Sequence, residues 1–344
     1  MNKIDLNNRV SVDGELQSQE KIEEWYVYEM KVKSTIEKNL DKLQFDKSNS
    51  DERQIINYLR QKIYCILLLN PSDIRNFDNK YISIRFQQCK GKKYKQQKNG
   101  EYVASSQGDT LCKLILDAFD YKGFRKTILK ELARRLNVKV CPYCNMQYTL
   151  VADENSGSLA KFQFDHFFSK QEYPWLSMSL YNLIPSCAEC NHGKSTGTLG
   201  LKFHPYKSDI YKQFVFRIPN TEDVLYDIQK KDYINIDLIH QNATTSTELD
   251  EYNQMFHIKT LYQRHGDIAR EVFEKAYQYP YWSNSQNYKS WVPKYSPMNQ
   301  LRLYLGTYVR QEEIEKRPMT KFIQDLWEQA RGKPIDTEIW LEDE

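Results

Sequence analysis

The sequence predicts an α+β protein, mainly α, in which a small zinc-stapled core lies between helical N-terminal and C-terminal regions. Two observations support this fold class. Both flanks carry apolar residues at helical spacing, and the segment between them contains two C-x-x-C pairs. The predicted regions are residues 1–136, 137–207 and 208–344.

Three amphipathic helices are predicted in the N-terminal region, because its apolar residues recur three or four positions apart. Asn70-Pro71 should stop the second, since proline cannot continue a helix. A basic loop separates the second helix from the third, which leads into a short strand before the first cysteine pair. The helices are expected at 15–45, 51–69 and 110–136, the basic loop at 90–98 and the strand at 138–140.

The C-terminal region begins with weakly alternating segments that predict short strands, followed by helical patterns. Pro280 is expected to end the first of these helices. The strands are expected at 213–218, 224–228 and 233–238, and the helices at 248–279, 297–309 and 318–329.

The two C-x-x-C pairs point to a metal site. Each pair can present two thiolates from a tight turn, and together they supply the four soft ligands of a closed tetrahedral Zn²⁺ site. Structural zinc is therefore predicted at Cys141, Cys144, Cys187 and Cys190. The other three cysteines stand alone, and no disulfides are expected.

The distribution of charge favours a protein that binds phosphate groups, and the hydropathy argues against a membrane-spanning helix. The net charge is only +3, but residues 81–150 carry 14 Lys/Arg against 5 Asp/Glu, while residues 336–344 form an acidic tail. This asymmetry predicts a phosphate-facing surface near the core. The longest apolar run, 63–69, has seven residues, far short of the roughly 20 that a membrane helix needs. With no signal peptide visible, a cytoplasmic protein without membrane contact is expected.

A set of polar residues lies between and just after the cysteine pairs. Asp165 and His166 are adjacent, Asn182 follows, and Asn191 and Lys194 come directly after Cys190. An imidazole can accept a proton from water near neutral pH, and carboxylate and amide oxygens suit Mg²⁺. Neighbouring side chains of a strand point to opposite faces. If Asp165 and His166 serve one phosphate, they must therefore lie at a strand end or bulge.

In this order and spacing the motif resembles the HNH endonucleases of the ββα-metal (His-Me finger) superfamily, in the subgroup whose third motif residue is Asn. The resemblance implies a ββα-metal nuclease core with His166 as the general base and Asn182 as the residue that orients it. It also implies that Asp165 and Asn191 bind a catalytic Mg²⁺ or Mn²⁺ ion, and that Lys194 lies near the phosphate.

The flanks look most like the PtuB-like HNH nucleases of Septu and retron-associated anti-phage defence systems. The segment 181–190 and a late pattern with Gly306, Tyr308 and 316–321 carry this wider resemblance. It implies an anti-phage effector that works beside an ABC/SMC-like ATPase. The chain has no G-x-x-x-x-G-K-[ST] motif of its own, so a partner would have to bring the ATPase.

Further basic residues are candidates for nucleic-acid contacts, because cations bind the phosphate backbone without reading sequence. His204, in a His-Pro-Tyr segment after the motif, is a further candidate for a catalytic or substrate role. The nucleic-acid candidates are Lys90, Lys92, Lys93, Lys95, Lys98, Lys170 and His192, with Arg125, Lys126, Arg134 and Arg135 as weaker ones.

Two alternatives stay open. One is a zinc-stapled nucleic-acid-binding module without catalysis, which has no need to keep Asp165, His166 and Asn191 together. The other is an RNA- or tRNA-directed nuclease on the same scaffold, because the site grips a phosphate and does not read a base. DNA is favoured on the family resemblance alone.

Overall fold

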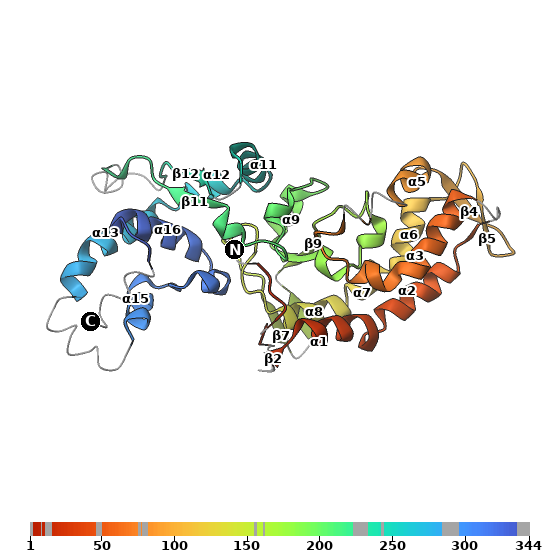
Figure 1. Cartoon of the computed structure of the whole chain (residues 1–344), viewed down its shortest axis with the longest axis horizontal. Helices are drawn as coiled ribbons and strands as arrows, with labels where there is room; N and C mark the ends of the chain where they lie inside the picture. The colour runs from red at the N-terminus through yellow and green to blue at the C-terminus, as the bar shows by residue number, and fades with distance from the viewer. Residues whose placement is uncertain are drawn as a thin grey trace.

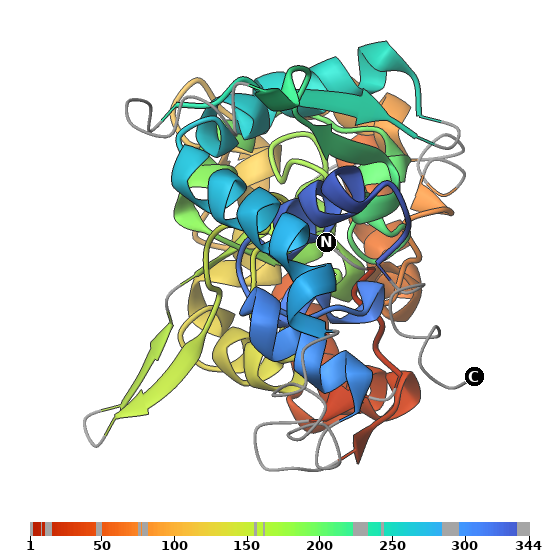
Figure 2. The ribbon, with the colours of Figure 1, turned by 90° about the vertical axis from the view of Figure 1, so that its left-hand side faces the viewer.

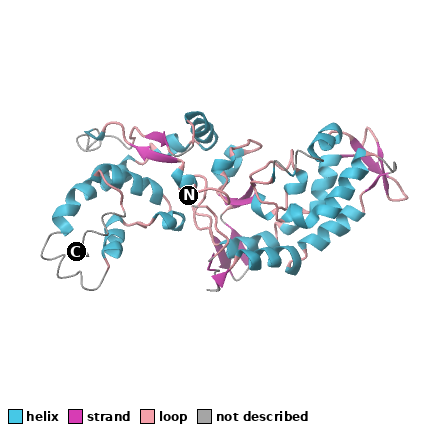
Figure 3. Cartoon of the chain, in the orientation of Figure 1, coloured by secondary structure: helices cyan, strands magenta, loops and turns pink. Residues whose placement is uncertain are grey.

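Helices dominate the computed structural model, and its strands form small separate sheets (Figure 3). The α+β, mainly α, class is therefore confirmed. The predicted strand 224–228 and the acidic tail 336–344 lie outside the described residues. The described residues are 3–7, 9–10, 16–45, 50–74, 77, 82–154, 157–160, 162–222, 233–241, 244–283 and 296–335.

The helix predicted at 15–45 is wrong as a single element. A π-helical turn, Trp25–Glu29, follows α1 (Gln19–Glu24), and Lys31 then takes a left-handed conformation with φ of 55° before α2 (Val32–Asp41) begins. The extra residue in the π turn changes the helical register, and both Trp25 and Tyr26 are buried. The first elements are β1 (Arg9–Val10), β2 (Leu16–Gln17), α1 (Gln19–Glu24) and α2 (Val32–Asp41).

The second predicted helix is confirmed as α3 (Asp51–Leu67), which Ser50 caps. The third is broken into α6 (Leu111–Phe119), α7 (Tyr121–Phe124) and α8 (Ile128–Leu136). Asp120 causes the first break, because it takes φ of 48° and its carboxylate accepts a hydrogen bond from the Gly123 N–H. An aspartate that bonds its own backbone in this way competes with helix continuation.

The middle of the predicted basic loop 90–98 is a strand, Lys93–Gln96. It follows α5 (Ile82–Cys89), and the Tyr94 side chain points inward, where its hydroxyl donates to Glu52. This sheet lies at the far end of the N-terminal helices from strand β9, Gln163–His166 (Figure 1). Its strand order is β3 (Gln44–Phe45), β5 (Glu101–Ala104), β4 (Lys93–Gln96), β6 (Asp109–Thr110).

The segment between the flanks contains two antiparallel strands followed by a helix. These are β9 (Gln163–His166), β10 (Leu183–Ser186) and α9 (Ala188–Lys194). The strand predicted at 138–140 is reduced to a single bridge between Val140 and Tyr148. A hairpin of β7 (Val151–Glu154) and β8 (Gly157–Ala160) projects from the body (Figure 2, yellow-green).

The C-terminal region differs from prediction at one helix and one strand. The helix predicted at 248–279 is interrupted at His257, which has φ of 53° and caps both of its neighbours. Pro280 does not end the helix as predicted, because it lies inside α13 (Gly266–Ser283). The strand predicted at 233–238 begins later. The elements are β11 (Phe214–Arg217), β12 (Asp237–His240), α11 (Ser246–Phe256), α12 (Ile258–Tyr262), α13 (Gly266–Ser283), α15 (Pro297–Leu305) and α16 (Thr320–Arg331).

The three predicted regions share one buried apolar cluster, which runs from Ile4 to Ile335. The C-terminal region packs directly on the middle segment, because α11 lies against α9. This approach is so close that a Cβ at Gly193 would meet the Met255 carbonyl oxygen at 2.7 Å. Within the described residues, none of the helices has the length and hydropathy needed to cross a bilayer.

A candidate metal centre and an adjoining polar pocket

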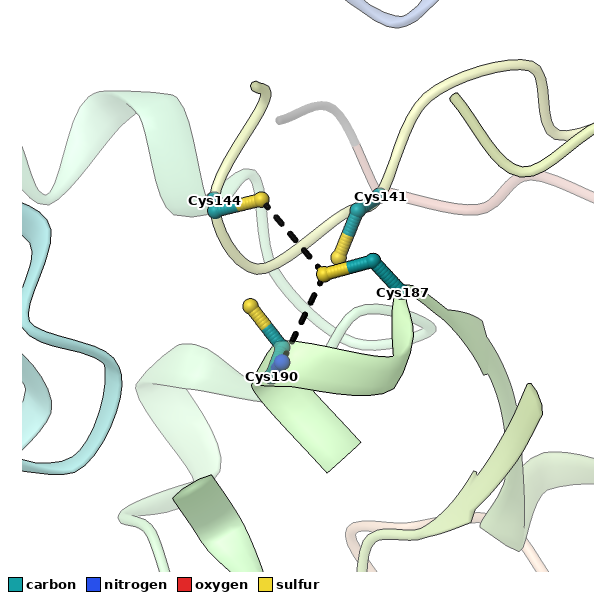
Figure 4. Close-up of side chains that lie close together, drawn as sticks. All are labelled: Cys141, Cys144, Cys187 and Cys190. Carbon is teal, nitrogen blue, oxygen red and sulfur yellow. Dashed lines mark hydrogen bonds between the residues drawn. The ribbon is translucent and has the colours of Figure 1, made fainter. Parts of the chain in front are cut away.

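The four cysteines of the two C-x-x-C pairs converge (Figure 4). All four are buried, and their sulfur atoms lie within 4.8 Å of one another. The Cys144 and Cys187 sulfurs are 3.9 Å apart. Tetrahedral zinc with bonds of about 2.3 Å would place its sulfurs about 3.8 Å apart. These residues could therefore bind a metal such as zinc.

Backbone donors and buried tyrosines hold the two cysteine turns in shape. The Met146 and Cys190 N–H groups each donate to a cysteine sulfur at 3.4 Å, which favours the thiolate. The Tyr262 hydroxyl donates to the Cys144 carbonyl at 2.7 Å. The C-terminal region thus supports the first cysteine pair directly.

Asn145 joins the first cysteine turn to the end of the chain. It has φ of 52°, its side-chain amide donates to the Ile314 carbonyl, and its side-chain oxygen accepts from the Lys321 N–H. Sequence reasoning missed Asn145. The signal was an asparagine directly after a C-x-x-C pair, where a residue that tolerates the left-handed conformation closes the turn.

The β9–β10–α9 unit brings together Asp165 and His166. His166 is the last residue of β9 and lies opposite Leu183 in β10, so the pair occupies a strand end. Cys187 then caps α9, and this helix carries Asn191 and Lys194. The short distance along the chain from β10 to α9 therefore ties the second cysteine pair to the Asp165-His166 strand.

The His166 ring has a defined orientation. Its Nε2 lies 3.0 Å from the Ser177 carbonyl oxygen. Because a carbonyl only accepts, Nε2 carries the proton and Nδ1 is the free acceptor. Burial, reinforced by the Lys170 and Lys194 charges, lowers the pKa of His166 to about 3. The imidazole is therefore neutral at pH 7 and can accept a proton.

Asn182 closes the loop that follows His166. Its side-chain oxygen accepts from the Phe168 N–H at 2.7 Å, and its amide donates to the Phe168 and Leu176 carbonyls. The residue is fully buried. Leu176 is the residue before Ser177, whose carbonyl holds the His166 ring. By holding Leu176, Asn182 therefore also fixes the position of Ser177.

Replacing Asn182 by alanine is expected to lower the free energy of unfolding by about 2–4 kcal/mol. The change leaves the buried Phe168 N–H and carbonyl without their partner, each costing about 1–3 kcal/mol before the loop relaxes, whereas the Leu176 carbonyl still accepts from the Ser179 N–H. Urea denaturation measures the loss. Asn57→Ala, on the exposed side of α3, is the control and should stay within about 0.5 kcal/mol of the wild type. An equal effect of both substitutions would contradict the bracing role.

Asp165 is 2% exposed and has two polar partners. The Tyr143 hydroxyl donates to its Oδ2 at 2.8 Å, and the Lys194 ammonium lies 3.3 Å from its Oδ1. Burial raises the pKa of Asp165 above its usual range, although Lys194 opposes this. Lys194 is buried too, and it also donates to the His166 carbonyl at 2.6 Å. Its ammonium is therefore committed to the protein interior.

A surface pocket of about 630 Å³ adjoins this pair. Among the described residues, Asp165 is its only acidic lining residue, and Lys194 balances that charge, so Arg125 and Lys170 leave the pocket positive. Neither of these two makes an ion pair within the described residues. The lining residues include Tyr121, Arg125, Gln163, Asp165, His166, Lys170, Asn191 and His192.

Asn191 and His192 both line the pocket. The Asn191 amide nitrogen donates to the Gln163 side-chain oxygen, and among described residues its own oxygen has no hydrogen-bond partner. His192 is exposed. Gln163 and Tyr121, whose ring lies 4.6 Å from the His166 ring, were not predicted as site residues. No sequence signal marks them, because a single Gln or Tyr is common.

Several predicted contact residues lie away from the pocket. None of the lysines of 90–98 lines it. Lys90 pairs with Glu172, and Lys92 pairs with Glu52. Lys93, Lys95 and Lys98 belong to the distant β4–β5 hairpin (Figure 1). The structure therefore separates Lys93, Lys95 and Lys98 from the Asp165-His166 pair, whereas Lys90 lies beside Glu172, next to the lining residue Gln171.

His204 does not line the pocket either. It is fully buried, its ring centroid lies 4.1 Å from that of Phe167, and its Nδ1 accepts from the Tyr206 N–H. Burial lowers the pKa of His204 to about 3. The His204 ring packs against Phe167, the residue after His166, and is not exposed to solvent. This burial argues against its predicted catalytic role.

Comparison with protein-family models, with curated proteins and with solved structures found no match. The function is therefore inferred from the chemistry of these side chains. What the structure brings together is a four-cysteine cluster, a neutral histidine with one free ring nitrogen, and oxygen-bearing side chains in a positive pocket.

Proposed function

We propose that this protein is a metal-dependent endonuclease of HNH type that hydrolyses nucleic-acid phosphodiester bonds, with DNA as the favoured substrate. The observation that carries the proposal is the orientation of His166. Its Nε2 is engaged by the Ser177 carbonyl, so Nδ1 is the ring atom left to accept a proton. It lines a positive pocket together with the oxygens of Asp165 and Asn191.

In this mechanism His166 takes the proton of an attacking water at Nδ1. The Ser177 carbonyl keeps the ring in the required tautomer, and the Asn182 hydrogen bonds hold the loop that presents this carbonyl. Arg125 and Lys170 attract the phosphate to the pocket.

Asp165 and Asn191 are the residues that would hold a catalytic Mg²⁺ or Mn²⁺ ion. Both offer oxygen ligands, which these hard cations prefer, and both line the same pocket. Such an ion supplies charge stabilisation at the phosphoryl and leaving 3′ oxygens. The buried four-cysteine cluster, by contrast, offers only sulfur and suits structural zinc.

Replacing Arg125 by glutamine is expected to weaken DNA binding several-fold. It should also lower the slope of log affinity against log salt by about 0.9, the value for one lost phosphate contact. Binding is measured by fluorescence anisotropy on a His166→Ala background, so that the DNA stays intact. Lys38→Gln, an exposed charge on α2, is the matched control. An unchanged salt slope in Arg125→Gln would place the phosphate elsewhere.

The same titration with Lys93→Gln and Lys95→Gln tests the predicted role of the lysine run. If DNA extends from the pocket to the β4–β5 hairpin, these substitutions lower the salt slope as well. If it does not, only the pocket residues matter.

The choice of DNA over RNA and the setting in anti-phage defence depend on the family resemblance. Supercoiled plasmid and tRNA should be tested side by side with Mg²⁺ and with Mn²⁺. Cleavage of RNA alone would favour the RNA-directed alternative. Binding without cleavage of either, at full zinc content, would favour a non-catalytic module or an enzyme that needs its ATPase partner. Co-purification from the native host would then identify that partner.

A further inference from the structure

Both cysteine pairs deliver a polar group to one carboxylate. Tyr143 lies between Cys141 and Cys144, and its hydroxyl donates to Asp165 Oδ2 at 2.8 Å. Lys194 ends α9, the helix that Cys187 caps, and it lies 3.3 Å from Asp165 Oδ1. Asp165 is thus held from both sides by elements that begin at the candidate metal centre.

The Tyr143 side chain cannot reorient independently of its turn. It is completely buried, and its ring stacks on Phe256 with centroids 4.7 Å apart. Its own carbonyl accepts a hydrogen bond from the Tyr252 hydroxyl. The position of its hydroxyl therefore follows the backbone of the first cysteine turn, which a bound metal would hold rigid through Cys141 and Cys144.

We infer that Tyr143 is a positioning residue that couples occupancy of the four-cysteine centre to divalent-ion binding at Asp165. This inference rests on the proposed function. A hydrogen bond to a ligand carboxylate fixes its orientation, and loss of such a bond costs about 10–100-fold in metal affinity. A phenylalanine at position 143 would fill the same space and stack on Phe256 equally well, so packing alone does not require the hydroxyl.

The first test compares Tyr143→Phe with the wild type, both loaded with zinc and free of nucleic acid. The Mn²⁺ dissociation constant is measured from the electron paramagnetic resonance signal of free Mn²⁺. Zinc content is measured by mass spectrometry. We expect an unchanged zinc content and a Mn²⁺ dissociation constant raised by about tenfold or more.

Tyr94→Phe is the matched control. Tyr94 is also buried, and its hydroxyl donates to the Glu52 carboxylate at 2.6 Å. It belongs to β4 and lies outside both the cysteine turns and the pocket. This variant loses the same kind of hydrogen bond and is expected to bind Mn²⁺ with wild-type affinity.

A second test uses the reciprocity of coupling. If Tyr143 links the two sites, saturating Mg²⁺ should tighten zinc binding in the wild type by the same factor by which zinc tightens Mg²⁺ binding. Competition with a zinc-selective chelator, with and without Mg²⁺, measures this. In Tyr143→Phe the Mg²⁺ effect on zinc affinity should largely disappear.

The outcomes separate this inference from the proposed function. Normal Mn²⁺ binding by Tyr143→Phe, or equal losses in Tyr143→Phe and Tyr94→Phe, would overturn the coupling and leave the nuclease proposal standing. Absence of Mn²⁺ binding by the wild type, with Asp165→Asn no different, would overturn both.

Discussion

Replacing His166 by alanine is expected to reduce phosphodiester cleavage by about 10²–10⁴-fold, the usual contribution of a general base. The substitution removes the only imidazole nitrogen in the pocket that is both buried and oriented by the protein, through the Ser177 carbonyl. Cleavage of supercoiled plasmid with Mg²⁺ or Mn²⁺ measures the loss, and zinc content is measured on the same samples.

His240→Ala is the control, because this exposed histidine at the end of β12 lies outside the pocket. It should cleave at the wild-type rate. Undiminished cleavage by His166→Ala at normal zinc content would rule out His166 as the base. A loss of cleavage together with a loss of zinc would show instead that the substitution had disturbed the fold.

Replacing Cys187 by serine is expected to abolish stoichiometric zinc binding and to lower the free energy of unfolding by about 4 kcal/mol or more. The reason is that metal-binding energy at a structural site is folding energy, and a hydroxyl is a poor substitute for a thiolate. Cys187 also caps α9, but serine is itself a preferred N-cap, so the expected loss comes from the metal ligand and not from the cap. Zinc analysis and denaturation measure the two effects.

Cys65→Ser provides the matched control, since Cys65 is exposed and lies far along the chain from the cluster. It should keep its zinc and its stability. If Cys187→Ser retained both, the four sulfurs would not form a structural metal site. Treatment of the wild type with a chelator should reproduce the Cys187→Ser phenotype, because it removes the same ligand-to-metal bonds.

Local patterns in the sequence were enough for the fold class and for the cysteine cluster. Periodicity located α3 closely, and C-x-x-C spacing identified four residues that the structure places within 4.8 Å of one another. The strand-end position of His166 followed from the geometry of a strand. All of these depend on neighbours a few residues apart, which a sequence displays directly.

Long helices were predicted less well. Lys31, Asp120 and His257 each take positive φ and divide a segment whose apolar spacing suggested one continuous helix. The spacing of apolar residues indicates which face of a helix is buried. It does not indicate where a single residue in a left-handed conformation ends the helix. Such turns are decided by side-chain hydrogen bonds, as between Asp120 and Gly123, and by packing against distant elements.

The candidate site, too, was determined partly by the sequence and partly by the tertiary structure. The sequence alone determined which residue types are available near the cysteine pairs, including Asp165, His166 and Asn191. Only the tertiary structure decided their partners. Lys194, predicted at the phosphate, is buried against Asp165, and Tyr143 completes that contact from the other cysteine pair. The physical reason is that a buried charge must find a counter-charge or donor nearby, and chain folding alone determines which one is within reach.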